Sequence, residues 1–154
     1  MRTVPAVLVA ALLLAACGPA ATKQPAGEWT SNAKGVIAQL RGDVLEISGA
    51  DRLPAAREAL HDDGQLYGLL VAFSDVAGCD HMVSSLGTRP SGAAGALGLL
   101  DRACSHLRAA GVLFTRANGQ NDAPALVAAA HEALVALPLL DRAALMLRLG
   151  RPRA

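Results

Sequence analysis

Aromatic residues are scarce in this chain, and segments with the pattern of a β-strand are absent. One Trp, one Tyr and two Phe make up 3% of the sequence, although 53% of its residues are hydrophobic. Alanine and leucine must therefore fill the core, and alanine buries little area but lets helices approach closely. No segment alternates apolar and polar residues over the length of a strand. The composition and pattern together favour an all-α fold.

An excess of charge of one sign is also missing. The chain has 14 Lys and Arg against 13 Asp and Glu, and one of the basic residues is Arg2 in the N-terminal apolar segment. A balanced chain lacks the electrostatic footprint of a nucleic-acid-binding protein, so we expect no nucleic-acid partner. Arg148, Arg151 and Arg153 form a small basic end, and we interpret residues 151–154 as a short solvated tail.

Catalytic and cofactor motifs are likewise absent from the sequence. It contains no Gly-x-Ser-x-Gly elbow and no Gly-x-x-x-x-Gly-Lys phosphate loop. Cys79-Asp80-His81 and Cys104-Ser105-His106 share a Cys-x-His pattern that a zinc site could use. On a helix, however, residues i and i+2 lie about 200° apart, so each Cys and its His face opposite ways. We therefore expect no metal, no cofactor and no catalytic residue.

The two remaining histidines, His61 and His131, are isolated in the sequence, and each stands beside an acidic residue. Placement on the exposed face of a helix explains both, and we predict the same for His81 and His106. A non-enzymatic protein is the reading that these absences favour.

The first 16 residues have the features of a bacterial export signal. Arg2 is followed by an apolar run from Val4 to Ala16, which is too short to span a bilayer as a helix and suits a signal peptide. The run ends in Leu14-Ala15-Ala16-Cys17, which resembles the lipobox of bacterial lipoproteins. The resemblance implies cleavage before Cys17 and lipidation of that residue. An ordinary cleaved signal, with Cys17 an incidental thiol, is the alternative.

The rest of the chain divides into a tether, a helical domain and the basic tail. Residues 17–28 contain Pro19, Pro25 and Gly27 without apolar periodicity, and we interpret them as a lipid-anchored flexible tether. Residues 29–150 form the predicted domain, an antiparallel bundle of four to five helices. Its helices are expected at 32–48, 53–63, 65–86, 93–117 and from Asp122 onward. No further apolar run is long enough to cross a membrane.

Capping residues and prolines set the expected helix boundaries. Ser31 or Asn32 is the predicted cap of the first helix, Asp51 the cap of the second, with Gly64 ending it, and Asp122 the cap of the last. Pro138 is predicted to kink or break that last helix, because proline lacks the N–H group that the helix needs.

Cys79 and Cys104 are predicted to form a disulfide between two helices. Export leads to a compartment where disulfides persist, and assigning Cys17 to the lipid leaves these two cysteines. Both lie on apolar helical stripes, and the midpoint between them falls within the turn at 87–92, as an antiparallel hairpin requires. Closing this loop should stabilise the fold by roughly 3 kcal/mol. Two buried free thiols are the alternative.

Two functions remain open for the exported domain. The first is a cell-envelope lipoprotein whose helical domain has a structural role or contacts another envelope protein. It would sit on the outer side of the cytoplasmic membrane or in the outer envelope of a bacterium. The second is a helical module that holds a small apolar ligand in a cleft lined by Ala, which requires an internal cavity of a few hundred Å³. An unrecognised enzyme is a distant third.

Overall fold

A computed structural model describes residues 26–149 of the chain. These residues form six α-helices and one 3₁₀-helix, with no strand among them. The elements are α1 (Ala26–Ile47), η1 (Ser48–Ala50), α2 (Leu53–His61), α3 (Asp63–Ala77), α4 (Cys79–Ser84), α5 (Ala94–Gln120) and α6 (Ala123–Leu149).

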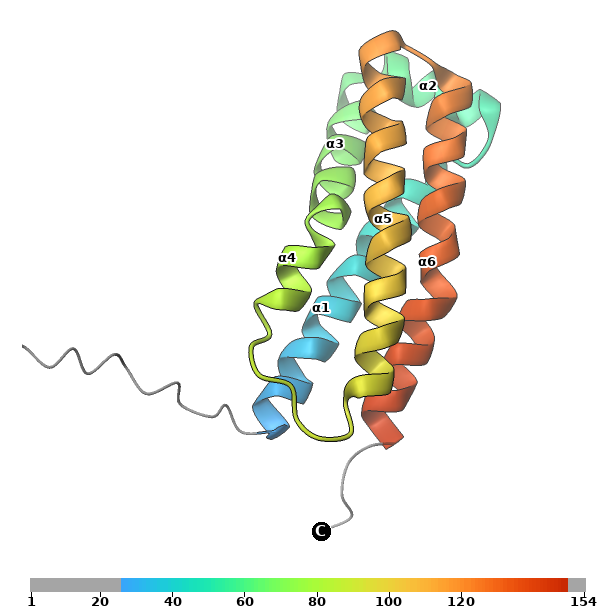
Figure 1. Ribbon diagram of the computed structural model, residues 1–154. Coiled ribbons are helices and arrows are strands. Elements are labelled where there is room, and N and C mark those ends of the chain that lie inside the picture. Colours follow the sequence, from blue (N-terminus) through green and yellow to red (C-terminus); the bar gives the residue numbers. More distant parts are fainter. Residues whose placement is uncertain (1–25, 150–154) are drawn as a thin grey trace, which may run out of the picture.

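The helices form an antiparallel bundle, which confirms the predicted fold class. Figure 1 shows α1, the α3–α4 pair, α5 and α6 running alternately up and down, with α2 across one end. Helix α1 packs against α3 and α6, and α5 packs against α3, α4 and α6. We call the end where α1 begins and α6 ends the lower end. The upper end holds α2 and the turn between α5 and α6.

The core consists of alanine and leucine side chains around a few larger ones. Trp29 is 1% exposed, and the Phe73 ring stacks on Phe114 with 4.2 Å between the centroids. No charged or polar residue is fully buried among the described residues. Within residues 26–149, every core residue lies between Trp29 and Leu147. A chain that begins at residue 18 therefore contains all of this described core and should fold without the N-terminal apolar segment.

The first helix begins earlier than the sequence pattern predicted. It starts at Ala26, inside the segment interpreted as a tether, so that interpretation is wrong for residues 26–28. Ser31 and Asn32 lie within the helix and do not cap it. The reason is Trp29, which continues the buried stripe one turn below Ala33 and anchors the first turn in the core.

Two boundaries in the middle of the chain also differ from expectation. The helix predicted at 65–86 is divided into α3 and α4 at Gly78. The predicted caps of α2 were wrong. Arg52 is its N-cap residue, Asp51 instead pairs with the Arg52 side chain at 3.4 Å, and α2 ends at His61. Asp62 is the N-cap residue of α3, and its Oδ1 accepts a hydrogen bond from the Gln65 N–H at 2.8 Å.

The last helix is continuous, so the break that was one of the two outcomes predicted at Pro138 does not occur. Asp122 does cap α6, accepting a hydrogen bond from the Ala125 N–H at 3.1 Å. Pro138 lies inside the helix on its exposed face, where water can satisfy the carbonyl that proline leaves without a donor. The expectation that no other segment is apolar enough to span a bilayer also fails. An 18-residue window within Ala123–Arg148 has a mean hydropathy of 1.7. A core helix of a bundle passes the same test, and α6 contributes buried residues from Ala123 to Leu147.

Candidate functional site

The predicted disulfide is present and joins α4 to α5. The Cα atoms of Cys79 and Cys104 lie 5.3 Å apart, and both side chains are 1% exposed. Nearby, α3 and α5 approach closely, and a Cβ added at Gly111 of α5 would lie 3.0 Å from the Cβ of Ala77 at the end of α3. Arg108 pairs with Asp80 at 3.2 Å on the outside of the same seam. The disulfide therefore fixes a tightly packed helical hairpin.

The four histidines do not assemble into a metal site. Within residues 26–149 no three His, Cys, Asp or Glu side chains are placed to share a metal ion. His61, His81 and His131 are exposed, as predicted. His106 differs, because it is half-buried and its Nδ1 lies 2.7 Å from Oε1 of Glu132 on α6. Sequence reasoning placed Glu132 beside His131 and missed this pair, which depends on the register between α5 and α6.

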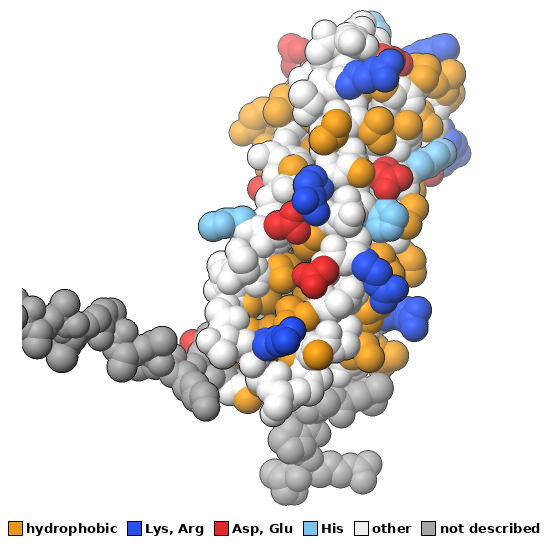
Figure 2. Space-filling view, viewed as in Figure 1, with side chains coloured by type: hydrophobic (Ala, Val, Ile, Leu, Met, Phe, Trp, Pro, Cys, Tyr) orange, Lys and Arg blue, Asp and Glu red, His pale blue; other side chains and the backbone are white. Residues whose placement is uncertain are grey.

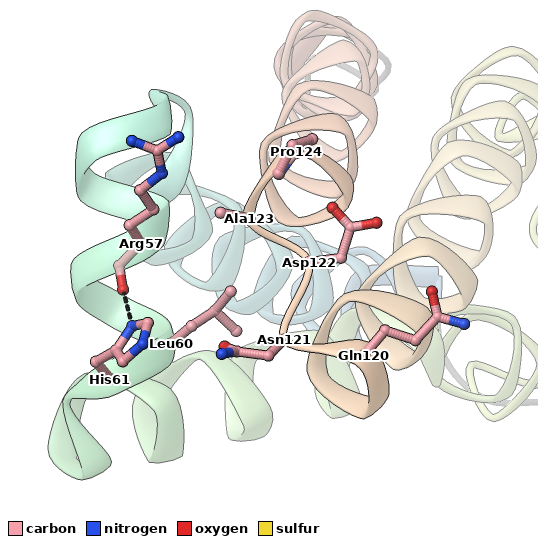
Figure 3. A pocket seen from close by; sticks show the side chains of 8 residues that line it. All are labelled: Arg57, Leu60, His61, Gln120, Asn121, Asp122, Ala123 and Pro124. Carbon is pink, nitrogen blue, oxygen red and sulfur yellow. Dashed lines mark hydrogen bonds between the residues drawn. The ribbon is translucent and has the colours of Figure 1, made fainter.

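A polar hollow of about 490 Å³ lies at the upper end, between α2 and the turn that joins α5 to α6. Figure 3 shows Leu60 and Asn121 pointing toward one another across it, while Gln120 and Asp122 point away. His61 Nδ1 is 2.7 Å from the carbonyl oxygen of Arg57 in its own helix. The Asp122 carboxylate caps α6, so no acidic side chain of this hollow pairs with the His61 imidazole. The residues that line the hollow supply no nucleophile.

Three carboxylates meet along the seam between α1 and α3. The pKa of Asp43 is raised because the side chain is partly removed from water and because Asp75 and Glu46 are nearby. Its Oδ2 is buried and has no hydrogen-bond partner among the described residues. Glu46 lies over Gly68, where an added Cβ would be 2.7 Å from Oε1. The result is a concentration of negative charge beside α3.

An apolar stripe lies on the solvent face of α3, next to this acidic seam. Tyr67, Leu70 and Val71 are 70%, 44% and 45% exposed, and their 3- and 4-residue spacing places them on one side of the helix. Val112 on the neighbouring helix α5 is 68% exposed. We call Tyr67, Leu70 and Val71 the α3 stripe. Large side chains exposed together in this way are a common feature of contact surfaces.

Charge is divided between the two ends of the bundle. The upper end, taken as residues 43–71 and 112–130, carries seven acidic and three basic side chains. The lower end, taken as residues 26–36, 84–98 and 142–149, carries four basic side chains and one acidic side chain, Glu28. An open groove of about 520 Å³ lies at the lower end between the start of α1, the loop before α5 and the end of α6.

Cys17, the residue predicted to carry the lipid, lies outside the described residues, as do the predicted signal and the basic tail at 151–154. No family model matches the chain, and neither a curated protein nor a solved structure is significantly similar to it.

Proposed function

We propose that this protein is a bacterial cell-envelope lipoprotein, exported and held to a membrane through lipid on Cys17, whose helical domain binds another envelope protein. The support for the anchor is the tetrapeptide Leu14-Ala15-Ala16-Cys17 after a short apolar run. Helix α1 begins at Ala26, so only eight residues separate Cys17 from the lower end of the bundle.

The observation that carries the binding role is the α3 stripe. A bundle with so few aromatic residues places its one tyrosine, Tyr67, on the surface beside Leu70 and Val71. Tyrosine is enriched at protein interfaces, because one residue supplies a large contact area and a polar tip. The stripe lies toward the upper end, away from the proposed anchor, where a partner can reach it.

Charge defines the partner that this surface fits. Asp63 precedes the stripe on α3, and Glu46, Asp43 and Asp75 border it on the side of α1. A complementary surface would present an apolar patch with lysine or arginine around it. Charges at the edge of an interface mainly raise the association rate and select the partner, whereas buried aromatic and aliphatic anchors supply most of the affinity.

The second candidate, a module for a small apolar ligand, has less support. The hollows described above open to solvent, and polar side chains such as Arg57 and Lys34 contribute to their walls. Sites for small apolar ligands are usually deeper and lined mainly by apolar side chains. In this bundle the interior positions are occupied by close-packed alanine and leucine, with Ala133 and Leu140 wholly buried.

Site-specific crosslinking in bacterial cells tests the proposed contact. A photoreactive phenylalanine derivative replaces Tyr67 in one strain and Val135, on the outer face of α6, in the control strain. We expect a discrete crosslinked product from position 67 that the control lacks. Mass spectrometry then identifies the partner, and binding is repeated with the purified protein.

A matched pair of substitutions measures the contribution of the stripe. Val71 and Val135 are 45% and 46% exposed, so Val71→Ser and Val135→Ser remove similar side chains from similar environments. In the proposed complex Val71 is a buried aliphatic anchor, so Val71→Ser should raise the Kd for the partner about tenfold. Val135→Ser should leave this Kd unchanged. Equal crosslinking at both positions, or equal effects of both substitutions, would contradict the proposed surface.

A further inference from the structure

We infer that the lower end of the bundle binds an anionic phospholipid surface directly, through Arg89, Arg142 and Arg148 around the exposed side chains of Leu145 and Met146. This inference rests on the proposed function, because the proposed anchor is what brings the lower end to a membrane. It adds a second, non-covalent contact and gives the domain a fixed orientation.

The first observation is the arrangement of basic side chains. Lys34 lies on α1, Arg89 on the loop between α4 and α5, and Arg142 and Arg148 on the last turns of α6. These four residues come from three parts of the chain that the fold gathers at one end. Glu28 is the single acidic residue of the lower end as defined above. Asp141, directly before Arg142 on α6, is paired with Arg41 at 2.8 Å. The lower end is therefore basic in a chain whose overall charge is nearly balanced.

The second observation is the apolar surface between these charges. Leu145 and Met146 are 53% and 47% exposed, although they lie in the last turns of a helix whose other face is in the core. Met146 leans over α5, where a Cβ added at Gly95 would meet its Cε at 2.9 Å. In Figure 2 blue and orange side chains occupy the lower right edge of the bundle without red ones among them. Exposed apolar side chains flanked by arginine are typical of surfaces that enter the headgroup region of a bilayer.

The third observation is the position of the chain ends. Helix α1 begins and α6 ends at the lower end (Figure 1), and the sequence adds Lys23 before α1 and Arg151 and Arg153 after α6. Eight residues between Cys17 and Ala26 can span at most about 28 Å. A short tether holds the lower end at high local concentration beside the bilayer, so even weak individual contacts are occupied.

Vesicle binding by the unlipidated chain, residues 18–154, tests this inference without relying on the anchor. The probe is a vesicle of phosphatidylcholine with or without phosphatidylglycerol, and the readout is co-flotation. We expect binding only when phosphatidylglycerol is present, and we expect salt to weaken it. Each arginine near an anionic surface should contribute about fivefold in affinity, so Arg142→Gln with Arg148→Gln should weaken binding about 25-fold.

The upper end supplies matched controls. Arg52→Gln with Arg57→Gln removes the same charge from exposed positions far from the proposed surface and should leave binding unchanged. Leu145→Ser should weaken binding severalfold, whereas Leu45→Ser, at a position 57% exposed, should not. Circular dichroism of every variant shows whether it is folded.

Three results would overturn the inference: no preference for phosphatidylglycerol, equal losses from the lower-end and upper-end pairs, or binding that is indifferent to Leu145. None of them depends on Cys17, which the tested chain lacks. Failure of the membrane contact and failure of the proposed lipid anchor are therefore distinguished, because the anchor is measured separately by lipid labelling in cells.

Discussion

Reduction of the Cys79–Cys104 disulfide should lower the thermal stability of the domain by a predictable amount. The bond joins residues 25 positions apart, and in the chain-entropy model closing such a loop destabilises the unfolded state by about 3.5 kcal/mol. Unfolding entropy of about 2.1 cal/mol/K per residue gives roughly 0.26 kcal/mol/K for residues 26–149. The ratio of these values predicts a decrease in Tm of about 13 °C.

The assay measures the thermal unfolding of residues 18–154 with and without a phosphine reductant. Circular dichroism and the fluorescence of Trp29 are the two readouts. This tryptophan is the only one in the chain and is buried at the lower end, so it reports the loss of the core directly. A Cys79→Ala, Cys104→Ala double variant serves as control, and its Tm should not respond to the reductant. A Tm change below about 3 °C in the wild-type chain would refute the argument, because the loop would then not be constrained by the bond.

Further tests concern two glycines of α5, the carboxylate of Asp43 and the response to a chelator. In chemical denaturation, Gly98→Ala should raise the free energy of unfolding by about 0.5–1 kcal/mol, because α5 gains helix propensity at a position where nothing lies within 4 Å. The free energy of unfolding of Gly111→Ala should be at least about 1 kcal/mol lower than that of Gly98→Ala, because the added Cβ meets Ala77. Equal effects of the two substitutions would show that α3 and α5 are not so close. The raised pKa of Asp43 means that folding disfavours its charged form, so Asp43→Asn should increase the free energy of unfolding by a few tenths of a kcal/mol at pH 7. This gain should disappear as the pH falls below the ordinary carboxyl range, because wild-type Asp43 is then protonated too. A gain that is unchanged at pH 3 would contradict this cause. A chelator should leave the Tm unchanged, and a drop of several degrees would restore the zinc hypothesis that we set aside.

The sequence was sufficient to predict the fold class and the disulfide, because both depend on local periodicity. The apolar stripe containing Ile37, Leu40 and Val44 marks the buried face of α1 whatever its neighbours are. Cys79 and Cys104 fall on such stripes at equal distances from a turn, so hairpin geometry alone brings them together. Helix division at Gly78 was less predictable, since the buried stripe continues through it from Val76 to Cys79.

Features that depend on how distant helices align could not be predicted in the same way. The contact of His106 with Glu132 requires the register of α5 against α6, and no covalent bond or pattern in the sequence fixes that register. The charge division between the two ends likewise appears only when the chain has been folded back on itself three times. The sequence did not exclude a break at Pro138, because the exposed position of this residue on α6 follows from tertiary packing rather than from its neighbours in the chain.

Metabolic labelling with palmitate tests the central proposal, the lipid anchor at Cys17, most directly. The full-length chain and its Cys17→Ala variant are expressed in bacteria, with the Cys79→Ala, Cys104→Ala variant as a control for labelling of other cysteines. We expect label on the wild type and on the control, and none on Cys17→Ala. Absence of label from the wild-type chain, or label that persists in Cys17→Ala, would contradict it.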